Sequence, residues 1–398
     1  MVRMIDFPVS FRMTDRLEHV AAEAPAAPLL PAIPALEMQA MLEAERTLGR
    51  LDQLLAEPDA RRRYHADAAR REALASARLD NFLVRWDELV LVAAGPGLAP
   101  IGNRAATLHA YDIWRATSAL QSSFHVAPGH DRGETGDDDD DVPNRPGLPL
   151  SVDLVEEVFR RSQLVSSGRA PESLCLTAEQ RAAVAEMLSR IEQAMALPGL
   201  LGAAMAVQAL HQVQGLERPG LAQESPRDGQ GDPSLRRYMV AHPARPLDWR
   251  LARLLAPALL AQACGLRHAA LWLSPAIAAD STGYRRLVGA PPAQWVLWFA
   301  GRVRVAAEDA CRRTADLATL AERWRQRIGK RRASSRIVAA AEHLFDRPLV
   351  SARAIQRHLE LSPRGAQLII NELSKLGIMR TVDDRASDRL FVADAMLR

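Results

Sequence analysis

SARAIQRHLELSPRGAQLIINELSKLG, residues 351–377, predicts two helices separated by a tight turn. Ser351 can cap the first, short helix, because a serine oxygen accepts one of the unpaired amides of a first helical turn. Ser362 can cap the second helix, and Pro363 suits its first position, where no amide hydrogen is needed. Gly377 supplies the left-handed residue that ends this second helix.

A further helix and a hairpin flank this stretch. Residues 335–345 place apolar side chains at helical spacing, and Pro348 closes the connection that follows. After the glycine the apolar period changes to two, so that residues 378–382 and 389–392 predict two strands joined by a turn. The order helix, helix, turn, helix, hairpin predicts a winged helix-turn-helix over residues 335–398.

Polar side chains that suit nucleic acid fall on the longer predicted helix and on the hairpin. By spacing, the solvent-facing residues of this helix are Arg364, Gln367, Asn371 and Lys375. Such side chains bind base edges and phosphates, and Arg385 and Arg389 fall where a wing would touch the DNA backbone. We therefore expect double-stranded DNA as a partner, although winged helices also serve as dimerisation or docking modules.

A basic run precedes the predicted winged helix. Residues 323–336 hold seven basic side chains, with Arg331 and Arg332 among them, and no acidic one. The formal net charge of the whole chain is only +3, so the positive charge is concentrated towards the C-terminal part. A solvated helix end would explain such a run alone, but beside this predicted fold it favours a polyanionic partner.

Length and composition indicate a mainly α-helical, multidomain protein. The chain has 398 residues, more than one ordinary core of about 150 residues needs, and aromatic residues make up only 5% of it. Its three cysteines are far apart and lack metal-ligand spacing, so we expect neither disulfides nor a metal site. The most apolar segment, residues 254–266, is about 13 residues long, too short to cross a bilayer. With no signal-peptide pattern, we expect a cytoplasmic protein that has no membrane contact.

The remaining organisation is a lead-in, a helical body and two inserts. Residues 1–35 are rich in proline and alanine and predict an irregular lead-in, whereas residues 36–330 predict a helical domain with flexible inserts near 128–149 and 215–233. Helical spacing predicts helices over 36–56, 60–86, 104–121, 152–161, 177–196, 199–214, 249–264, 275–287 and 292–328. Five adjacent aspartates at 137–141 predict a solvated loop rather than a calcium site, because they lack alternating ligand spacing and a central glycine.

Two stretches of the predicted body resemble one enzyme family. HPARPLDWRLAR, residues 242–253, has the length and end residues of H-P-F-x-D-G-N-G-R-x-x-R, the signature of the Fic family. Upstream, Ser76, Asp80 and Asn81 resemble the [ST]-x-x-x-E-[GN] motif of the family's inhibitory helix, with aspartate in place of glutamate. The whole chain looks most similar to rhizobial, and hence bacterial, Fic-derived proteins that carry a C-terminal DNA-binding helix-turn-helix.

The resemblance implies a nucleotide site whose chemistry has been lost. Fic enzymes transfer AMP from ATP to a protein hydroxyl with the signature histidine as general base, and the matching residues His242, Arg250 and Arg253 are retained. The family's magnesium-binding acid is matched by Pro246, which carries no charge for a metal. Its glycines, which cradle phosphate, are matched by Leu247 and Trp249, and its apolar anchor by Ala244. Bulky side chains at the glycine positions obstruct a close approach of phosphate to the backbone, so we expect a pseudoenzyme without a cofactor.

Three hypotheses follow for function. The first is a DNA-binding transcription regulator whose degenerate Fic-like body serves as a dimerisation or ligand-sensing scaffold, so that a homodimer is a possible assembly. The alternative is a divergent AMP or phosphoryl transferase that acts on protein hydroxyls through His242. A third is an inhibitory partner of another protein. Because the family's inhibitory acid pairs with the second signature arginine, we also expect the carboxylate of Asp80 beside Arg253 or Arg250.

Overall fold

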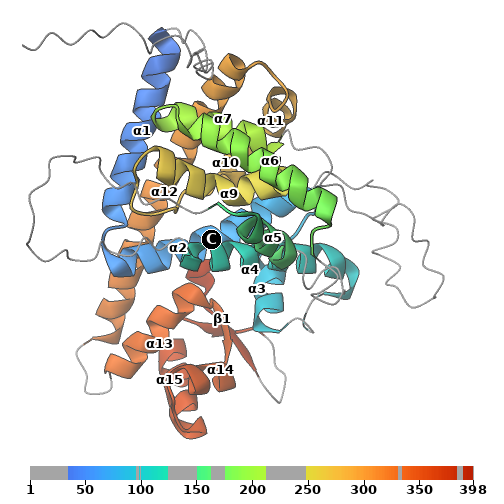
Figure 1. Cartoon of the computed structure of the whole chain (residues 1–398). Helices are drawn as coiled ribbons and strands as arrows, with labels where there is room; N and C mark the ends of the chain where they lie inside the picture. Colours follow the sequence, from blue (N-terminus) through green and yellow to red (C-terminus); the bar gives the residue numbers. More distant parts are fainter. Residues whose placement is uncertain are drawn as a thin grey trace, which may run out of the picture.

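The chain is mainly α-helical and has one small antiparallel sheet near its C-terminus (Figure 1). This is a computed structural model, and it describes residues 35–95, 98, 100–123, 150–162, 175–211, 248–329, 334–382 and 389–397. The expected mainly helical class is confirmed. The predicted lead-in, apart from its last residue, and both predicted inserts lie outside the described residues, so the structure tests none of them.

The helical body is formed by the helices that precede residue 330. They are α1 (Ala35–Leu54), α2 (Pro58–Leu79), α3 (Trp86–Ala94), α4 (Arg104–Ser123), α5 (Val152–Arg161), α6 (Ala178–Met195), α7 (Gly199–His211), α9 (Asp248–Ala263), α10 (Ser274–Ala278), α11 (Ser281–Leu287) and α12 (Pro292–Ile328). The longest, α12, packs along α1, while α2 packs on α4 and α7 packs on α9. Among the described residues, no helix is both long enough and apolar enough to cross a membrane.

Capping residues explain where these helices begin and end. The hydroxyl of Thr177 accepts a hydrogen bond from the backbone N–H of Gln180, and the side-chain oxygen of Gln180 accepts one from the backbone N–H of Thr177, forming a capping box. The single helix expected over 60–86 is wrong, because α2 ends at Leu79 and Asn81 adopts a left-handed φ of 67°. The helix expected over 275–287 is likewise divided, because Asp280 caps a new helix, α11.

The C-terminal unit, residues 334–397, combines three helices with the sheet. Its elements are α13 (Ser334–Asp346), β1 (Leu349–Ser351), α14 (Ala352–His358), α15 (Pro363–Lys375), β2 (Arg380–Thr381) and β3 (Leu390–Val392). The strand order is β1-β3-β2, with Leu349 and Arg380 both opposite Val392. The expected hairpin strands are shorter than predicted, the predicted turn between them lies largely outside the described residues, and β1 was not predicted.

The predicted caps of this unit are present. The hydroxyl of Ser351 accepts a hydrogen bond from the N–H of Ala354 at 3.3 Å, and that of Ser362 accepts one from the N–H of Gly365 at 3.1 Å. Gly377 has a φ of 64°, the left-handed conformation that ends α15. These local signals set where α14 and α15 begin and where α15 ends.

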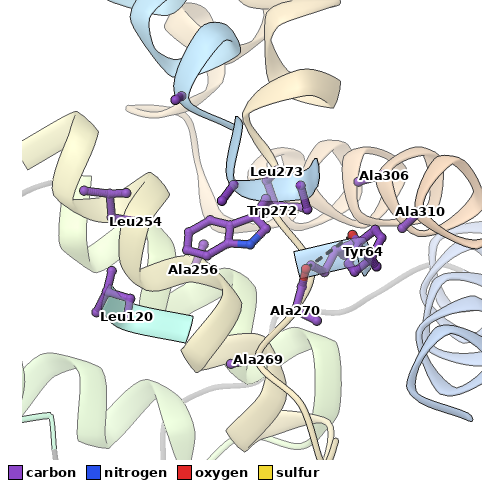
Figure 2. Packing of buried hydrophobic residues seen from close by; sticks show 14 of the residues in the cluster. Tyr64, Leu120, Leu254, Ala256, Ala269, Ala270, Trp272, Leu273, Ala306 and Ala310 are labelled. Carbon is purple, nitrogen blue, oxygen red and sulfur yellow. Dashed lines mark hydrogen bonds between the residues drawn. The ribbon is translucent and has the colours of Figure 1, made fainter. Parts of the chain in front are cut away.

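One hydrophobic cluster extends through the body and the C-terminal unit. In the body, Figure 2 shows Trp272 beside Ala256 and Leu273, and Tyr64 beside Ala270, to whose carbonyl the hydroxyl of Tyr64 donates at 3.3 Å. Leu344 and Phe345 of α13 are completely buried and belong to the same cluster as the body residues. The C-terminal unit is therefore docked on the body rather than held by its connecting chain alone.

Buried arginine side chains of α2 hold α13 in this position. Arg70, which is fully buried, donates to the carbonyl of Phe345 at 2.8 Å and to that of Asp346 at 3.0 Å, both at the C-terminal end of α13. Arg63 pairs with Glu342 at 2.9 Å. The last carbonyl groups of a helix have no donor within the helix. A guanidinium that donates to them therefore satisfies acceptors that would otherwise be unpaired.

Replacing Arg70 by methionine should therefore loosen the docking of the C-terminal unit. We expect the free energy of unfolding to fall by about 2 to 3 kcal/mol, because two buried carbonyls lose their donor. Urea unfolding measures the change. The matched control is Arg71→Met, one residue along, whose pair with Asp309 is partly exposed and should contribute less than about 1 kcal/mol. Equal losses from both variants would contradict the docking role of Arg70.

Candidate functional site

The outer face of α15 presents a row of polar side chains. Arg364, Gln367, Asn371 and Lys375 are all exposed. The opposite face of the helix is buried in the C-terminal unit and consists of Ala366, Ile369, Ile370 and Leu373. This amphipathic pattern fixes the rotation of α15, so the four polar residues predicted from spacing do face away from the core.

Two of these side chains order one another. The amide nitrogen of Gln367 donates to the side-chain oxygen of Asn371 at 2.9 Å. This hydrogen bond leaves the carbonyl oxygen of Gln367 and the amino group of Asn371 for other partners. A carbonyl acceptor and an amino donor, held side by side on one helix, match the complementary groups that a base edge displays in the major groove.

Leu368 lies on the same face and was missed by the sequence analysis. Its side chain is 61% exposed although its neighbours Ile369 and Ile370 are buried. Alternation between polar and apolar residues gave no signal for it, because a leucine is normally assigned to the core. An exposed apolar side chain among polar ones can contact the methyl group of thymine.

A groove beside α15 brings further residues to this face. It has a volume of about 610 Å³ and is lined by Ala352, Arg353, Gln356, Pro363, Gln367, Arg389 and Phe391. It therefore joins Arg389, predicted for the hairpin, to Gln367 of α15. Arg353 and Gln356 of α14 were missed, because the sequence did not show that their helix borders the groove.

The positions of the other predicted polyanion-binding residues are not described. Arg331, Arg332 and Arg385 lie outside the described residues. Lys375 is exposed in the last turn of α15, at the far end from Arg364. The structure thus places Arg364, Gln367, Asn371, Lys375 and Arg389 on one exposed unit.

A second cluster joins the C-terminal end of α2 to the start of α9. The carboxylate of Asp80 accepts hydrogen bonds from Arg253 at 2.7 Å and from Arg250 at 3.1 Å. Ser76 accepts one from Nε of Arg253 at 3.0 Å, and Nε2 of His109 lies 3.2 Å from Asp80. The expected proximity of Asp80 to both arginines is confirmed, whereas Asn81 is exposed and turns the chain away.

The charges of this cluster interact strongly because its side chains are buried. The side chain of Arg253 is 1% exposed and that of Asp80 is 13% exposed. Burial alone would raise the pKa of Asp80, but Arg253 and Arg250 outweigh it and hold the pKa well below its usual range. Asp80 is therefore a carboxylate that neutralises two arginines, and it occupies the guanidinium of Arg253.

Glu72 lies about two helical turns before Asp80 on α2 and is completely buried. It accepts hydrogen bonds from the backbone N–H and the hydroxyl of Ser274. Burial raises its pKa to about 7, against the weaker opposing effects of Ser274 and Arg253. A carboxyl whose pKa is higher in the folded state is a cost to folding once the pH rises above its pKa in the unfolded chain.

We expect Glu72→Gln to become more stable than the wild type as the pH rises. Below about pH 4.5 both side chains are neutral, and between about 4.5 and 7 the wild type loses up to about 1.4 kcal/mol per pH unit relative to the variant. Glutamine can still accept from the N–H of Ser274 and donate to its hydroxyl. Urea unfolding at pH 5 and pH 8 measures the difference, with exposed Glu179→Gln as control. A difference that does not grow with pH would contradict a raised pKa at Glu72.

Trp249, at the start of α9, borders a buried group of aromatic rings. His211 lies 2.7 Å from the carbonyl of Val207 and 2.5 Å from the hydroxyl of Tyr284, and burial lowers the pKa of His211 to about 3. The rings of Trp249 and Tyr284 are 5.2 Å apart, edge to face. The histidine is therefore neutral and enclosed, and the indole of Trp249 is part of this packing.

Part of the signature-like stretch is not described. His242, the predicted general base, and the positions up to 247 lie outside the described residues. Within the described ranges, no group of three or more histidine, cysteine, aspartate or glutamate side chains is arranged to hold a metal ion.

A scan against protein-family models and a search of curated proteins returned no match. Of the two clusters described above, the outer face of α15 is open to a large partner, whereas the Asp80 cluster is closed by its own ion pairs.

Proposed function

We propose that the C-terminal unit is a winged helix-turn-helix that binds double-stranded DNA, and that the chain is a transcription regulator. The observation that carries this proposal is the exposed face of α15, where Arg364, Gln367 and Asn371 follow one another along the helix. A helix that enters the major groove needs this combination of a charged residue for phosphate or guanine and amides for base edges.

The surroundings of α15 support the same use. Ser362 caps its N-terminal end, the end that carries partial positive charge and suits phosphate. Arg353 and Arg389 line the adjoining groove, which Gln367 also borders. Cations beside a base-reading helix suit contacts with the phosphates that border a DNA groove.

We further propose that the body is a catalytically degenerate Fic-like scaffold. The ion pairs of Asp80 with Arg253 and Arg250 support this, because the inhibitory-helix resemblance predicted this contact between residues 173 positions apart. The alternative transferase function is disfavoured by the residues of the signature-like stretch, because Pro246, Leu247 and Trp249 supply neither a metal ligand nor a phosphate cradle.

A gel shift on genomic fragments tests the DNA proposal directly. Binding should be sequence-specific and should weaken steeply as salt rises, because phosphate contacts release counterions. Substitutions at Gln367 and Asn371 should change the choice of sequence, whereas Arg331→Ala and Arg332→Ala should weaken binding to all sequences and reduce the salt slope. Absence of any salt-sensitive complex with genomic fragments would overturn the proposal.

ATP with magnesium should not raise the melting temperature of the protein. A ligand stabilises a fold only if it binds the native state, and Arg253 is occupied by Asp80 and Ser76. Differential scanning fluorimetry of the wild type and of His242→Ala measures this. An ATP-dependent increase of several degrees that His242→Ala removes would revive the transferase alternative.

A further inference from the structure

A cavity lies where the helical body meets the C-terminal unit. It has a volume of about 600 Å³ and is lined by Pro58, Arg61, Arg62, His65, Ala66, Tyr111, Trp114, Arg115, Ser118, Gln121, Asp346 and Arg347. Most of these residues belong to α2 and α4 of the body, while Asp346 and Arg347 come from the end of α13. The volume is in the range of sites that bind small organic molecules.

The lining of this cavity carries an excess of positive charge. Four arginines face one carboxylate, that of Asp346, which already pairs with Arg62 at 2.9 Å. Among the described residues, no carboxylate pairs with Arg61, Arg115 or Arg347. Arginine side chains that converge on a cavity without carboxylate partners are a site for an anion, and their planar forks favour carboxylate or phosphate.

Neighbouring groups hold these arginines in place. The guanidinium of Arg115 lies over the ring of Tyr111 at 5.9 Å, and that of Arg347 lies over the ring of Trp114 at 5.8 Å. Arg347 also donates to the carbonyl of Ala93 at 3.1 Å. Cation–π contacts and backbone acceptors position a guanidinium without neutralising it, so its charge stays available to a ligand.

A larger groove of the body provides the contrast. It is bordered by α2, α10 and α12, and three of its arginines are paired: Arg71 and Arg312 with Asp309, and Arg313 with Asp67. Its lining holds four carboxylates against five arginines, whereas the smaller cavity holds one carboxylate against four arginines. The excess of positive charge is therefore larger in the smaller cavity.

We propose that the cavity between α2, α4 and the end of α13 binds a small organic anion, one carboxylate or phosphate group on a single aromatic ring. The acid group binds Arg115 and Arg347, and the ring lies against Tyr111, Pro58 and Ala66, which line the same cavity. The ring packs on this apolar part of the lining, which a bare inorganic ion cannot do.

The ligand bridges two parts of the chain. Arg115 belongs to the body and Arg347 to the C-terminal unit, so an anion that binds both adds a contact between them. Ligand binding therefore strengthens the docking that Arg70 and Arg63 already provide. The proposal does not depend on DNA binding, and its test uses no DNA.

Isothermal titration calorimetry of the full chain tests it with three probes: phenyl phosphate, 4-hydroxybenzoate and inorganic phosphate. We expect one of the two aromatic anions to bind at one site per chain with a Kd of about 100 µM or less. The better aromatic probe identifies phosphate or carboxylate as the acid group. Inorganic phosphate should bind at least about 10-fold more weakly, because it has no ring.

Matched variants locate the site. Arg115→Ala and Arg347→Ala should each weaken binding of the aromatic probe by about 10-fold or more, whereas Arg312→Ala, in the larger groove, should leave it unchanged. Saturating probe should also slow hydrogen exchange of the backbone amides at the end of α13. The proposal is overturned if neither aromatic anion binds by about 1 mM. It is also overturned if Arg115→Ala and Arg347→Ala bind like the wild type, or if exchange at α13 does not slow.

Discussion

Asp80→Ala should lower the free energy of unfolding by about 3 to 5 kcal/mol, because removing one partner of a buried ion pair strands the other charge. Here two charges are stranded: the side chain of Arg253 is 1% exposed and that of Arg250 is 12% exposed. Ser76 would still accept one hydrogen bond from Arg253. It cannot replace the negative charge, so most of the destabilisation should remain.

Urea unfolding at neutral pH measures this effect. Asp87→Ala is the matched control, because Asp87 pairs with Arg85 at 2.9 Å at an exposed site, where a salt bridge contributes less than about 1 kcal/mol. Asp80→Asn keeps the shape of the side chain but removes its charge, and it should resemble Asp80→Ala more than the wild type. If Asp80→Ala lost no more stability than Asp87→Ala, the pairing of Asp80 would not be structural.

The same ion pairs make the free energy of unfolding depend on pH. The pKa of Asp80 is held well below its usual range by Arg253 and Arg250, so the folded state retains its negative charge in acid longer than the unfolded chain does. The stabilisation is present above the ordinary carboxyl pKa of about 3.9 and is lost as the pH falls below it. The difference between the wild type and Asp80→Asn should therefore shrink in acid.

Local signals in the sequence predicted the C-terminal unit well. Ser351, Ser362 and Gly377 each act within one turn of helix, so the residues that define α14 and α15 are neighbours in the chain. The exposed face of α15 followed from helical spacing alone. Such features depend on contacts of short sequence separation, which a single sequence displays directly.

Long-range contacts account for most of what the sequence did not predict. β1 is three residues long, and it forms only because β3, some 40 residues later, pairs with it. The predicted helix at 60–86 is divided because Asn81 adopts a left-handed φ of 67°, directly after Asp80, whose side chain pairs with arginines of α9. Periodicity cannot reveal a partner so distant, whereas the resemblance to Fic motifs did predict this one.

The docking of the C-terminal unit was missed for a related reason. Nothing in the sequence indicated that Arg62, Arg63 and Arg70 have partners in the C-terminal unit, since charged residues are mostly exposed. In the structure they bind Glu342, Asp346 and the carbonyls at the end of α13. The predicted boundary near residue 330 separates two parts of the sequence. In the structure, one buried hydrophobic cluster contains residues from both parts.

The triple variant Arg364→Ala, Gln367→Ala, Asn371→Ala should lose specific DNA binding by at least about 100-fold. Each good bidentate contact to a base contributes about 1 to 3 kcal/mol of discrimination, and the variant removes the side chains that can make such contacts. Folding should be unaffected, because all three residues are exposed and the buried face of α15 is unchanged. Fluorescence anisotropy with a fragment selected by the wild type measures the loss.

A matched control shows that the effect belongs to α15 and not to the loss of polar surface. Arg190 and Gln193 on α6 are also exposed and also three residues apart, so Arg190→Ala, Gln193→Ala removes the same chemistry from the body. This double variant should bind like the wild type. In the triple variant the residual binding should become non-specific, with a salt slope reduced by about one unit if Arg364 contacts a phosphate. Unchanged affinity and unchanged sequence preference in the triple variant would exclude α15 as the helix that contacts base edges, and the C-terminal unit would then be a docking or dimerisation module.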